Sequence, residues 1–189
     1  PMWIRDEQTM DILAVNEAAL HSYGYSRAEF LALKSTDVHV PEDIERYVET
    51  IRARDPMRSF TSQWRHRRKD GSVMEVETVS YPFDLDGRTA RLTLVNDITE
   101  RRRAERRLQL GHTITRILAE ARSAEEALPQ VLQAICETGG WAYGQRWALD
   151  KAANQLTCAE TWRAPGREIE QFQAYNRSRL QAAGSGQGL

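Results

Sequence analysis

The stretch VNDITERRRAERRL, residues 95–108, passes from an apolar strand end into a run of arginines with almost no loop between them. Asp97 and Thr99 stand where a carboxylate and a hydroxyl can cap the first turn of a helix. Asp97 is also within reach of Arg101 for a charge-assisted contact. The sequence therefore predicts a strand that runs directly into a helix over residues 100–122, so that a small shift of the strand tilts or rotates the helix.

Three strands are expected before this helix. The segments SFTSQWRHRR, SVMEVETVSYPF and RTARLTLVND contain alternating apolar and polar residues, and the turn sequences Lys-Asp-Gly and Asp-Gly separate them. Alternation along the last strand favours Leu92 and Leu94 on the buried face, with Arg91 and Thr93 on the exposed face. These segments predict an antiparallel meander with one buried face.

The N-terminal third predicts a hairpin followed by helices. MWIRD and ILAV are short β-prone runs, and Asn16 is placed to cap the helix EAALHSY. Ser26 and Glu29 form a capping box for RAEFLAL. A longer helix is predicted over residues 41–55, with an apolar stripe at Ile44, Tyr47, Val48 and Ile51. The order of elements predicts an α+β domain with an antiparallel sheet and helices on one face.

The pattern begins again after the arginine-rich helix. Ser123 is placed to cap the helix EALPQVLQAICET, and WAYGQRWAL and QLTCAETW alternate as the strands of a hairpin do. A further helix is expected in REIEQFQAYNRSRLQA, through Ile169, Phe172 and Tyr175. We expect this part to be the first half of a second α+β domain, in a chain that is a piece of a longer protein.

Three motifs carry a resemblance to a known family. VNEAALHSYGYSRAEF, RRKDGSVMEVE and DITERRRAE occur in the order and at the spacing of sensory-box members of the PAS family, over about residues 3–99. The segment SAEEALPQVLQAICETGGWAYGQRWAL resembles the opening of a GAF domain. The resemblance implies a PAS domain over residues 1–99 with a five-stranded antiparallel sheet, a long signalling helix over 100–122, and a truncated GAF-like α+β domain over 123–189.

The same resemblance implies a class of protein. Tandem PAS and GAF modules are typical of bacterial multidomain signalling proteins, so we expect the input module of a sensor histidine kinase. An input module of a diguanylate cyclase or phosphodiesterase is one alternative. A structural dimerisation spacer without ligand is the other. The expected partners are a second copy of the chain, bound through the flanking helices, and the C-terminal output domain of the parent chain.

Bulk composition argues against several other classes. A net charge of -1 and a pI near 6.5 give no general attraction to nucleic acid or to an anionic membrane. No apolar run approaches the roughly 20 residues of a membrane-spanning helix, and the two cysteines favour a cytoplasmic protein without disulfides. The sequence has no phosphate-binding glycine loop, nucleophile elbow or zinc-ligand spacing. We therefore expect no catalytic residues, no metal ligands and no enzyme activity.

The PAS resemblance implies a cavity between the long helix and the sheet. Haem is not expected, because the helix over residues 41–55 has no histidine, and His21, His39 and His66 are predicted to be structural or surface residues. A flavin adduct is not expected either, because both cysteines, Cys136 and Cys158, lie in the second domain. A filled core, a small organic ligand and a non-covalent flavin stay open. The predicted lining residues are Tyr23, Tyr25, Phe30, Val48, Ile51, Trp64, Leu92 and Asn96.

Signal output is predicted at the junction of strand and helix. The residues expected to couple the two are Asp97, Ile98, Thr99 and Arg101. Apolar residues recur along the helix and predict a contact between the helices of two protomers, at Ile98, Ala104, Leu108, Ile114, Ile117 and Ala121. Gly111 is expected to interrupt this seam.

Overall fold

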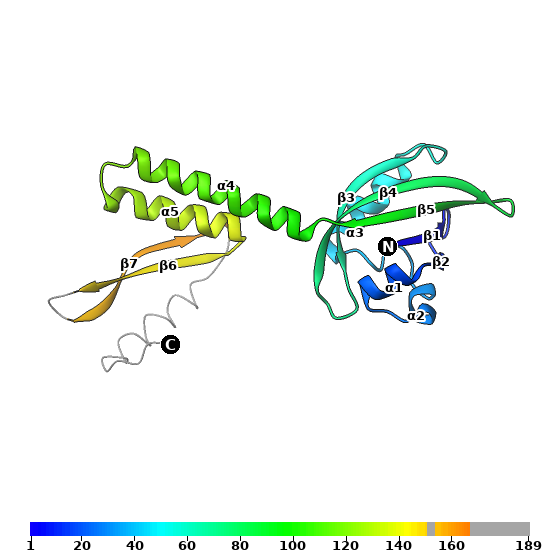
Figure 1. The fold of residues 1–189 in the computed structure, drawn as a ribbon, viewed down its shortest axis with the longest axis horizontal. Helices are drawn as coiled ribbons and strands as arrows, with labels where there is room; N and C mark the ends of the chain where they lie inside the picture. Colours follow the sequence, from blue (N-terminus) through cyan, green and yellow to red (C-terminus); the bar gives the residue numbers. More distant parts are fainter. Residues whose placement is uncertain (151–153, 167–189) are drawn as a thin grey trace. The chain divides into compact units, whose positions relative to one another are not determined.

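The computed structural model describes residues 1–150 and 154–166. The chain divides into two compact units, Pro1–Ala104 and Glu105–Leu189 (Figure 1). The predicted helix through Ile169, Phe172 and Tyr175 lies outside the described residues, as does most of the predicted C-terminal part of the GAF-like domain.

The first unit contains one five-stranded sheet and three helices. Neighbouring strands are all antiparallel, in the order β2-β1-β5-β4-β3. The strands are β1 (Met2–Asp6), β2 (Ile12–Val15), β3 (Phe60–Arg67), β4 (Val73–Leu85) and β5 (Arg88–Asp97). The helices are α1 (Glu17–Tyr23), α2 (Arg27–Leu31) and α3 (Pro41–Arg52). The predicted α+β fold with a five-stranded antiparallel sheet is confirmed.

The sequence features that were expected to start and stop the helices do so. The Asn16 side chain accepts a hydrogen bond from the Ala19 amide at 2.9 Å, and Gly24 ends α1 with a left-handed φ of 77°. Ser26 and Glu29 form the complete capping box of α2. Asn16 also accepts from the Met2 amide at 3.1 Å, so the same side chain joins the start of α1 to β1.

The helices pack on one face of the sheet and form a single core with it. Tyr23, Phe30 and Tyr47 come from α1, α2 and α3, and they are buried in one cluster with Trp3 of β1 and Val95 of β5. Several of these aromatic rings meet edge to face, with Trp3 and Tyr23 at 5.5 Å between centroids. This face of the sheet therefore determines which side chains can line an internal cavity.

The predicted orientation of β5 is wrong. Arg91 is fully buried and Thr93 is buried, whereas Leu94 is 37% exposed on the opposite face. Arg91 tolerates burial because its Nε donates to Glu7 at 2.7 Å and its Nη2 to the Pro56 carbonyl at 2.7 Å. A buried cation with its donors satisfied avoids most of the desolvation cost, so the apolar character of Leu92 and Leu94 does not decide the face.

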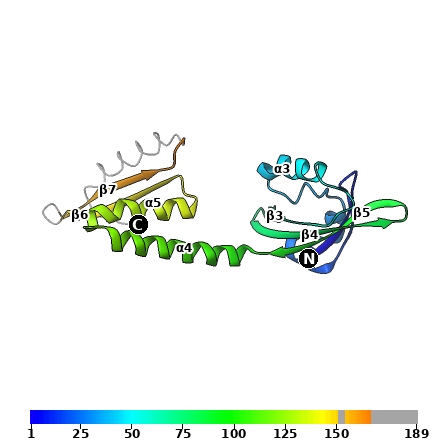
Figure 2. The same cartoon turned by 90° about the horizontal axis from the view of Figure 1, so that it is seen from above.

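In the second unit two helices lie beside each other, as both views show (Figures 1 and 2). Helix α4 (Thr99–Glu120) starts in the first unit, and α5 (Ala124–Gly139) follows after a short turn. Strands β6 (Tyr143–Asp150) and β7 (Gln155–Arg163) form the expected antiparallel hairpin. Gly144 is needed where β6 passes α5, because a Cβ at this position would overlap the sulfur of Cys136.

Helix α4 continues through Gly111, although glycine lowers helix stability by about 1 kcal/mol relative to alanine. The Thr115 hydroxyl donates to the Gly111 carbonyl at 2.9 Å, so local bonding continues there. Cys136 is buried and Cys158 is exposed.

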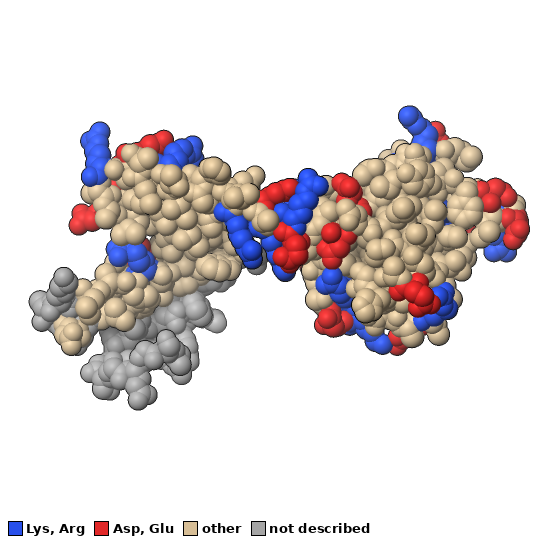
Figure 3. Space-filling view, viewed as in Figure 1, with Lys and Arg blue, Asp and Glu red and all other residues tan. Residues whose placement is uncertain are grey.

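Helix α4 carries the arginine run as a solvated face. None of its side chains is buried, and acidic and basic side chains alternate near its start on the face shown in Figure 3. Arg103 pairs with Glu100 at 2.7 Å, at the helical spacing that favours such contacts. Over residues 1–150 and 154–166, no helix has both the length and the apolar character needed to cross a membrane.

Candidate functional site

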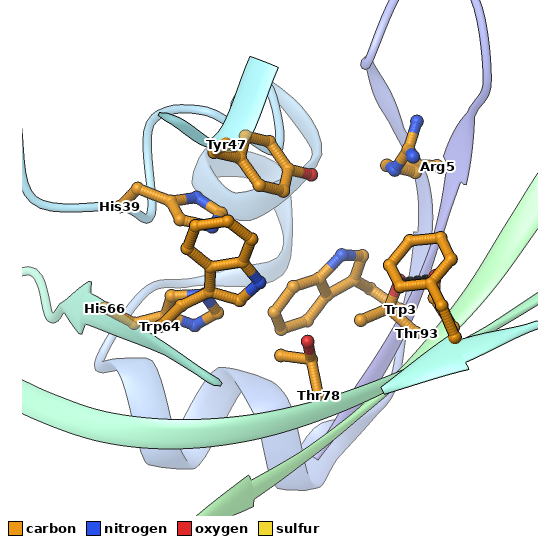
Figure 4. A pocket seen from close by; sticks show the side chains of 10 residues that line it. Trp3, Arg5, His39, Tyr47, Trp64, His66, Thr78 and Thr93 are labelled. Atoms are coloured by element: carbon orange, nitrogen blue, oxygen red, sulfur yellow. Dashed lines mark hydrogen bonds between the residues drawn. The ribbon is translucent and has the colours of Figure 1, made fainter. Parts of the chain in front are cut away.

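A small cavity lies inside the first unit, between the helices and the inner face of the sheet (Figure 4). Its volume is about 20 Å³, which is room for one water-sized molecule. Nine of the ten lining residues are buried, and Phe60 is half-buried. The lining residues are Trp3, Arg5, His39, Tyr47, Phe60, Trp64, His66, Thr78, Ser80 and Thr93.

His39 forms one wall of the cavity and is held in a defined tautomer. Its Nδ1 lies 2.9 Å from the Ser35 carbonyl oxygen, which can only accept, and its ring stacks on Tyr47 at 3.9 Å between centroids. Burial lowers the pKa of His39 to about 4, so the ring is neutral at pH 7. Nδ1 therefore carries the proton, and Nε2 presents a lone pair.

His66 lies next to His39, with 4.5 Å between the ring centroids. Its Nδ1 is 2.6 Å from the Tyr23 hydroxyl. Burial holds the pKa of His66 well below its usual range and raises the pKa of Tyr23, so the imidazole is neutral and the phenol keeps its proton. The Tyr23 hydroxyl has no other acceptor among the described residues, so we assign it as the donor to Nδ1, and this assignment places the His66 proton on Nε2.

Three polar atoms at this cavity are buried without a hydrogen-bond partner in the part of the chain that the structure describes. They are Trp3 Nε1, His39 Nε2 and His66 Nε2. Figure 4 shows the rings of Trp3, His39 and His66 among the lining side chains, with the Trp64 ring drawn between the histidines and Trp3. Buried donors and acceptors are rarely left unpaired in folded proteins, so this concentration marks the cavity as a place for a polar group.

A charged network closes the cavity near β1. The buried side chains of Arg5 and Arg91 share Glu7, at 3.1 Å and 2.7 Å. The Arg54 guanidinium lies over the ring of Phe60, 3.5 Å from its centroid, and Arg91 lies over the same ring at 4.8 Å. One carboxylate thus holds two buried cations in place behind an aromatic wall.

Only one of the predicted lining residues, Trp64, lines the cavity. Tyr23, Phe30 and Ile51 are buried in the surrounding core, and Tyr25 and Val48 are half-buried against it. Leu92 and Asn96 were placed on the wrong face, because β5 turns Arg91, Thr93 and Val95 inward: Leu92 is half-buried on the outer face and Asn96 is exposed.

The lining residues that were missed had a sequence signal. His66 is two residues from Trp64 on one strand, and Thr78 is two residues from Val76 on the next, so period two places each pair on one face. Their polar character pointed to the surface instead. Once Trp64 and Val76 are assigned to the core, this periodicity predicts His66 and Thr78 inside.

The junction between β5 and α4 is built from side-chain caps. Asp97 Oδ1 accepts from the Thr99 amide at 2.9 Å, and the Thr99 hydroxyl accepts from the Glu75 amide of β4 at 2.9 Å. The Ile98 amide donates to the Glu75 carbonyl at 2.9 Å, and the Ile98 side chain is buried. Thr99 and Ile98 therefore fasten the first turn of α4 to the neighbouring strand.

In the structure Arg68 lies against Asp97. Arg68 Nη2 lies 2.9 Å from Asp97 Oδ2, and its Nε donates to the Ser22 carbonyl at 2.9 Å. The next residue, Lys69, donates its amide to the Tyr23 carbonyl at 3.0 Å. The end of α1 thus contacts the cavity through the Tyr23 hydroxyl and the junction through Arg68.

Comparison with solved structures found PAS domains to which this chain is similar. A PAS domain in a protein from Haloarcula marismortui described as HTR-like is 24% identical with a TM-score of 0.47, covering 51% of this chain and 79% of that chain. The PAS domain of a protein from Colwellia psychrerythraea is 24% identical with a TM-score of 0.48, covering 52% of this chain and 86% of that chain. A PAS domain from a two-component sensor histidine kinase is 20% identical with a TM-score of 0.44, covering 51% and 82%.

The curated proteins include no significant match to this chain. The family comparison is more specific than the structural one, because it rests on the sequence over the whole first unit apart from its last residues. The sequence model of the PAS domain matches residues 1–100, the segment that forms the sheet, the cavity and the start of α4. The chain belongs to the PAS domain family.

Proposed function

We propose that residues 1–99 are the sensory input domain of a bacterial sensor histidine kinase and that α4 carries its output. The observation that supports this most is the line of contacts between the cavity and the start of α4. The cavity supplies a place for a stimulus, and the junction supplies an element whose position a stimulus can change. The proposal assigns no catalytic step to this chain.

The first link of the proposed route is the bond between His66 and Tyr23. His66 lines the cavity, and its Nδ1 accepts from the Tyr23 hydroxyl at 2.6 Å. A group that binds His66 Nε2 polarises or rotates the imidazole. The buried Tyr23 ring moves with it, because the Tyr23 hydroxyl is hydrogen-bonded to His66 Nδ1. Tight packing around both rings favours a discrete shift over a gradual one.

The second link joins the end of α1 to α4. Arg68 holds the Ser22 carbonyl with Nε and the Asp97 carboxylate with Nη2. Asp97 in turn accepts from the Thr99 amide in the first turn of α4. A displacement of the end of α1 therefore acts on the residues that fix where α4 begins, with no flexible segment between them.

We also propose that the chain forms a homodimer through α4. Among the predicted seam residues, Ile98 is buried in the first unit, and Ile114 and Ile117 are half-buried in the second. The exposed stripe is different: Leu108 and Leu118 are 67% and 57% exposed. With Gly111 and Thr115 they recur at alternating steps of three and four residues, which is the spacing of a two-helix seam.

Labelling of the parent protein with radioactive ATP tests the proposed class. Transfer of label to a histidine, reduced or made constitutive by Asp97→Asn, supports a histidine kinase whose input passes the junction. The control is Glu17→Gln, an exposed carboxylate on α1 that pairs with Arg27 away from the junction. Synthesis or hydrolysis of a cyclic dinucleotide would replace the proposed class by the alternative one. Output that is unchanged by Asp97→Asn would exclude the junction as the path.

A further inference from the structure

We propose that the cavity is a receptor for one neutral hydroxyl group, supplied either by a bound water molecule or by a small alcohol. The inference rests on the proposed input role of this cavity and adds the chemistry of what it binds. It follows from the donors and acceptors that the cavity presents, from its size, and from the burial of its walls.

The cavity presents two donors and one acceptor. The Trp3 Nε1–H group is a donor in every protonation state, and the bond from Tyr23 leaves the His66 proton on Nε2 as the second donor. The bond from His39 Nδ1 to the Ser35 carbonyl leaves His39 Nε2 as an acceptor. These three atoms have no hydrogen-bond partner among the described residues.

A hydroxyl group matches this set. Its oxygen accepts two hydrogen bonds and its proton serves one acceptor, so its hydrogen-bonding capacity equals the two donors and the one acceptor. A carboxylate has no proton for His39 Nε2, and an ammonium group has no lone pair for Trp3 and His66. A nitrile or an ether accepts but donates nothing, which leaves His39 Nε2 unpaired.

Size and burial agree with a single small group. A cavity of about 20 Å³ holds one water molecule, which is stable when it has two to four polar partners, whereas an alcohol such as ethanol also needs the aromatic walls to move apart. The other polar walls are already engaged: Ser80 and Thr93 hydroxyls bond each other at 3.1 Å, and the Thr78 hydroxyl donates to the Ser62 carbonyl. The Tyr47 hydroxyl donates to Ser35 Oγ at 3.0 Å, and Arg5 pairs with Glu7 at 3.1 Å, so these two polar side chains are engaged as well.

The test uses the whole 189-residue chain and the nitrogen-15 spectrum of its tryptophan indole groups. Trp3→Phe identifies the Trp3 indole signal, and Trp141→Phe, at a residue 58% exposed in the second unit, is the matched control. The probes are ethanol, acetonitrile and formate, which offer a hydroxyl, an acceptor alone and an anion. Magnetisation transfer from water to the Trp3 indole proton reports a long-lived bound water.

Saturable displacement of the Trp3 signal by ethanol, with no saturable response to acetonitrile or formate, assigns the site to a small alcohol. Transfer from a long-lived water without an ethanol response assigns it to water. Either result supports the hydroxyl receptor. Tyr23→Phe, which removes only the hydroxyl that fixes the His66 tautomer, is expected to weaken ethanol binding by about threefold to tenfold, the loss of one hydrogen bond.

A response to acetonitrile equal to that of ethanol would overturn the inference, as would the absence of both bound water and ethanol binding. The amide exchange of residues 98–102 is followed in the same samples. Hydroxyl binding without any change of exchange there leaves the receptor standing and contradicts the proposed input role. If Tyr23→Phe changes amide exchange at the junction while the cavity binds no hydroxyl, the input role stands and the hydroxyl receptor is contradicted.

Discussion

The two units of the chain bury their side chains very differently. The first unit has a continuous core that draws on three helices and all five strands, with Tyr23 and Phe30 fully buried. Among the described residues of the second unit, only Ala127 and Cys136 are buried, and Trp141 and Leu156 are 58% and 62% exposed. A domain that must register a small internal event needs the dense packing of the first unit, because loose packing absorbs displacement.

The largest expected effect is a separation of the two units in unfolding. Trp3 and Trp64 report the first unit, while Trp141, Trp147 and Trp162 report the second. Urea is expected to produce two transitions, the earlier one belonging to the second unit because it buries less apolar surface. Fluorescence of the chain with either set of tryptophans replaced by phenylalanine assigns each transition. A single unfolding transition reported by both sets of tryptophans would contradict the difference in burial between the two units.

Glu7→Gln is expected to destabilise the first unit by about 3 to 5 kcal/mol, because two buried arginines lose their shared carboxylate. The side chains of Arg5 and Arg91 are 2% and 1% exposed, so solvent cannot replace the lost charge. Chemical denaturation with tryptophan detection measures the change. The matched control is Glu17→Gln, whose carboxylate pairs with Arg27 at the surface. Equal losses of stability in the two variants would show that the buried network adds nothing to the stability of the first unit.

The first unit is expected to lose stability as the pH falls from about 6.5 toward 4. Burial lowers the pKa of His39 to about 4, so between these values the unfolded chain binds a proton that the folded chain does not. That difference is worth about 3 kcal/mol in all, present above pH 6.5 and lost progressively on acidification. His39→Gln should reduce this dependence and leave the part that His66 contributes, since burial also lowers the pKa of His66, and His112→Gln, at an exposed residue of α4, should leave it intact. A stability profile that is flat in the unchanged chain contradicts the neutral buried imidazole.

The sequence predicted most of the first unit because its signals are local. The strand RTARLTLVND was placed with its observed bounds, and Asn16 and Ser26 cap the helices that they were expected to cap. The orientation of β5 was missed because it depends on Glu7, which lies 84 positions from Arg91 along the chain. A pattern of apolar residues along one strand does not reveal a buried cation whose partners lie far away in the sequence.

The cavity was missed for a related reason. Its predicted lining was a set of large apolar residues, whereas the structure uses polar ones that are paired elsewhere or unpaired: His39, His66, Thr78 and Arg5. At the junction, Asp97 contacts Arg68, which comes from the turn before β4. Local sequence identified where the site begins, and tertiary contacts determined which side chains complete it.

The most direct test of the account is amide hydrogen exchange at the first turn of α4. Tyr23→Phe removes the hydroxyl that bonds His66, and Tyr81→Phe removes a hydroxyl from a half-exposed residue on the outer face of β4. The account predicts faster exchange at the Ile98, Thr99 and Arg102 amides in Tyr23→Phe and unchanged exchange in Tyr81→Phe. Unchanged exchange at these amides in both variants, with the first unit folded, would contradict coupling between the cavity and α4.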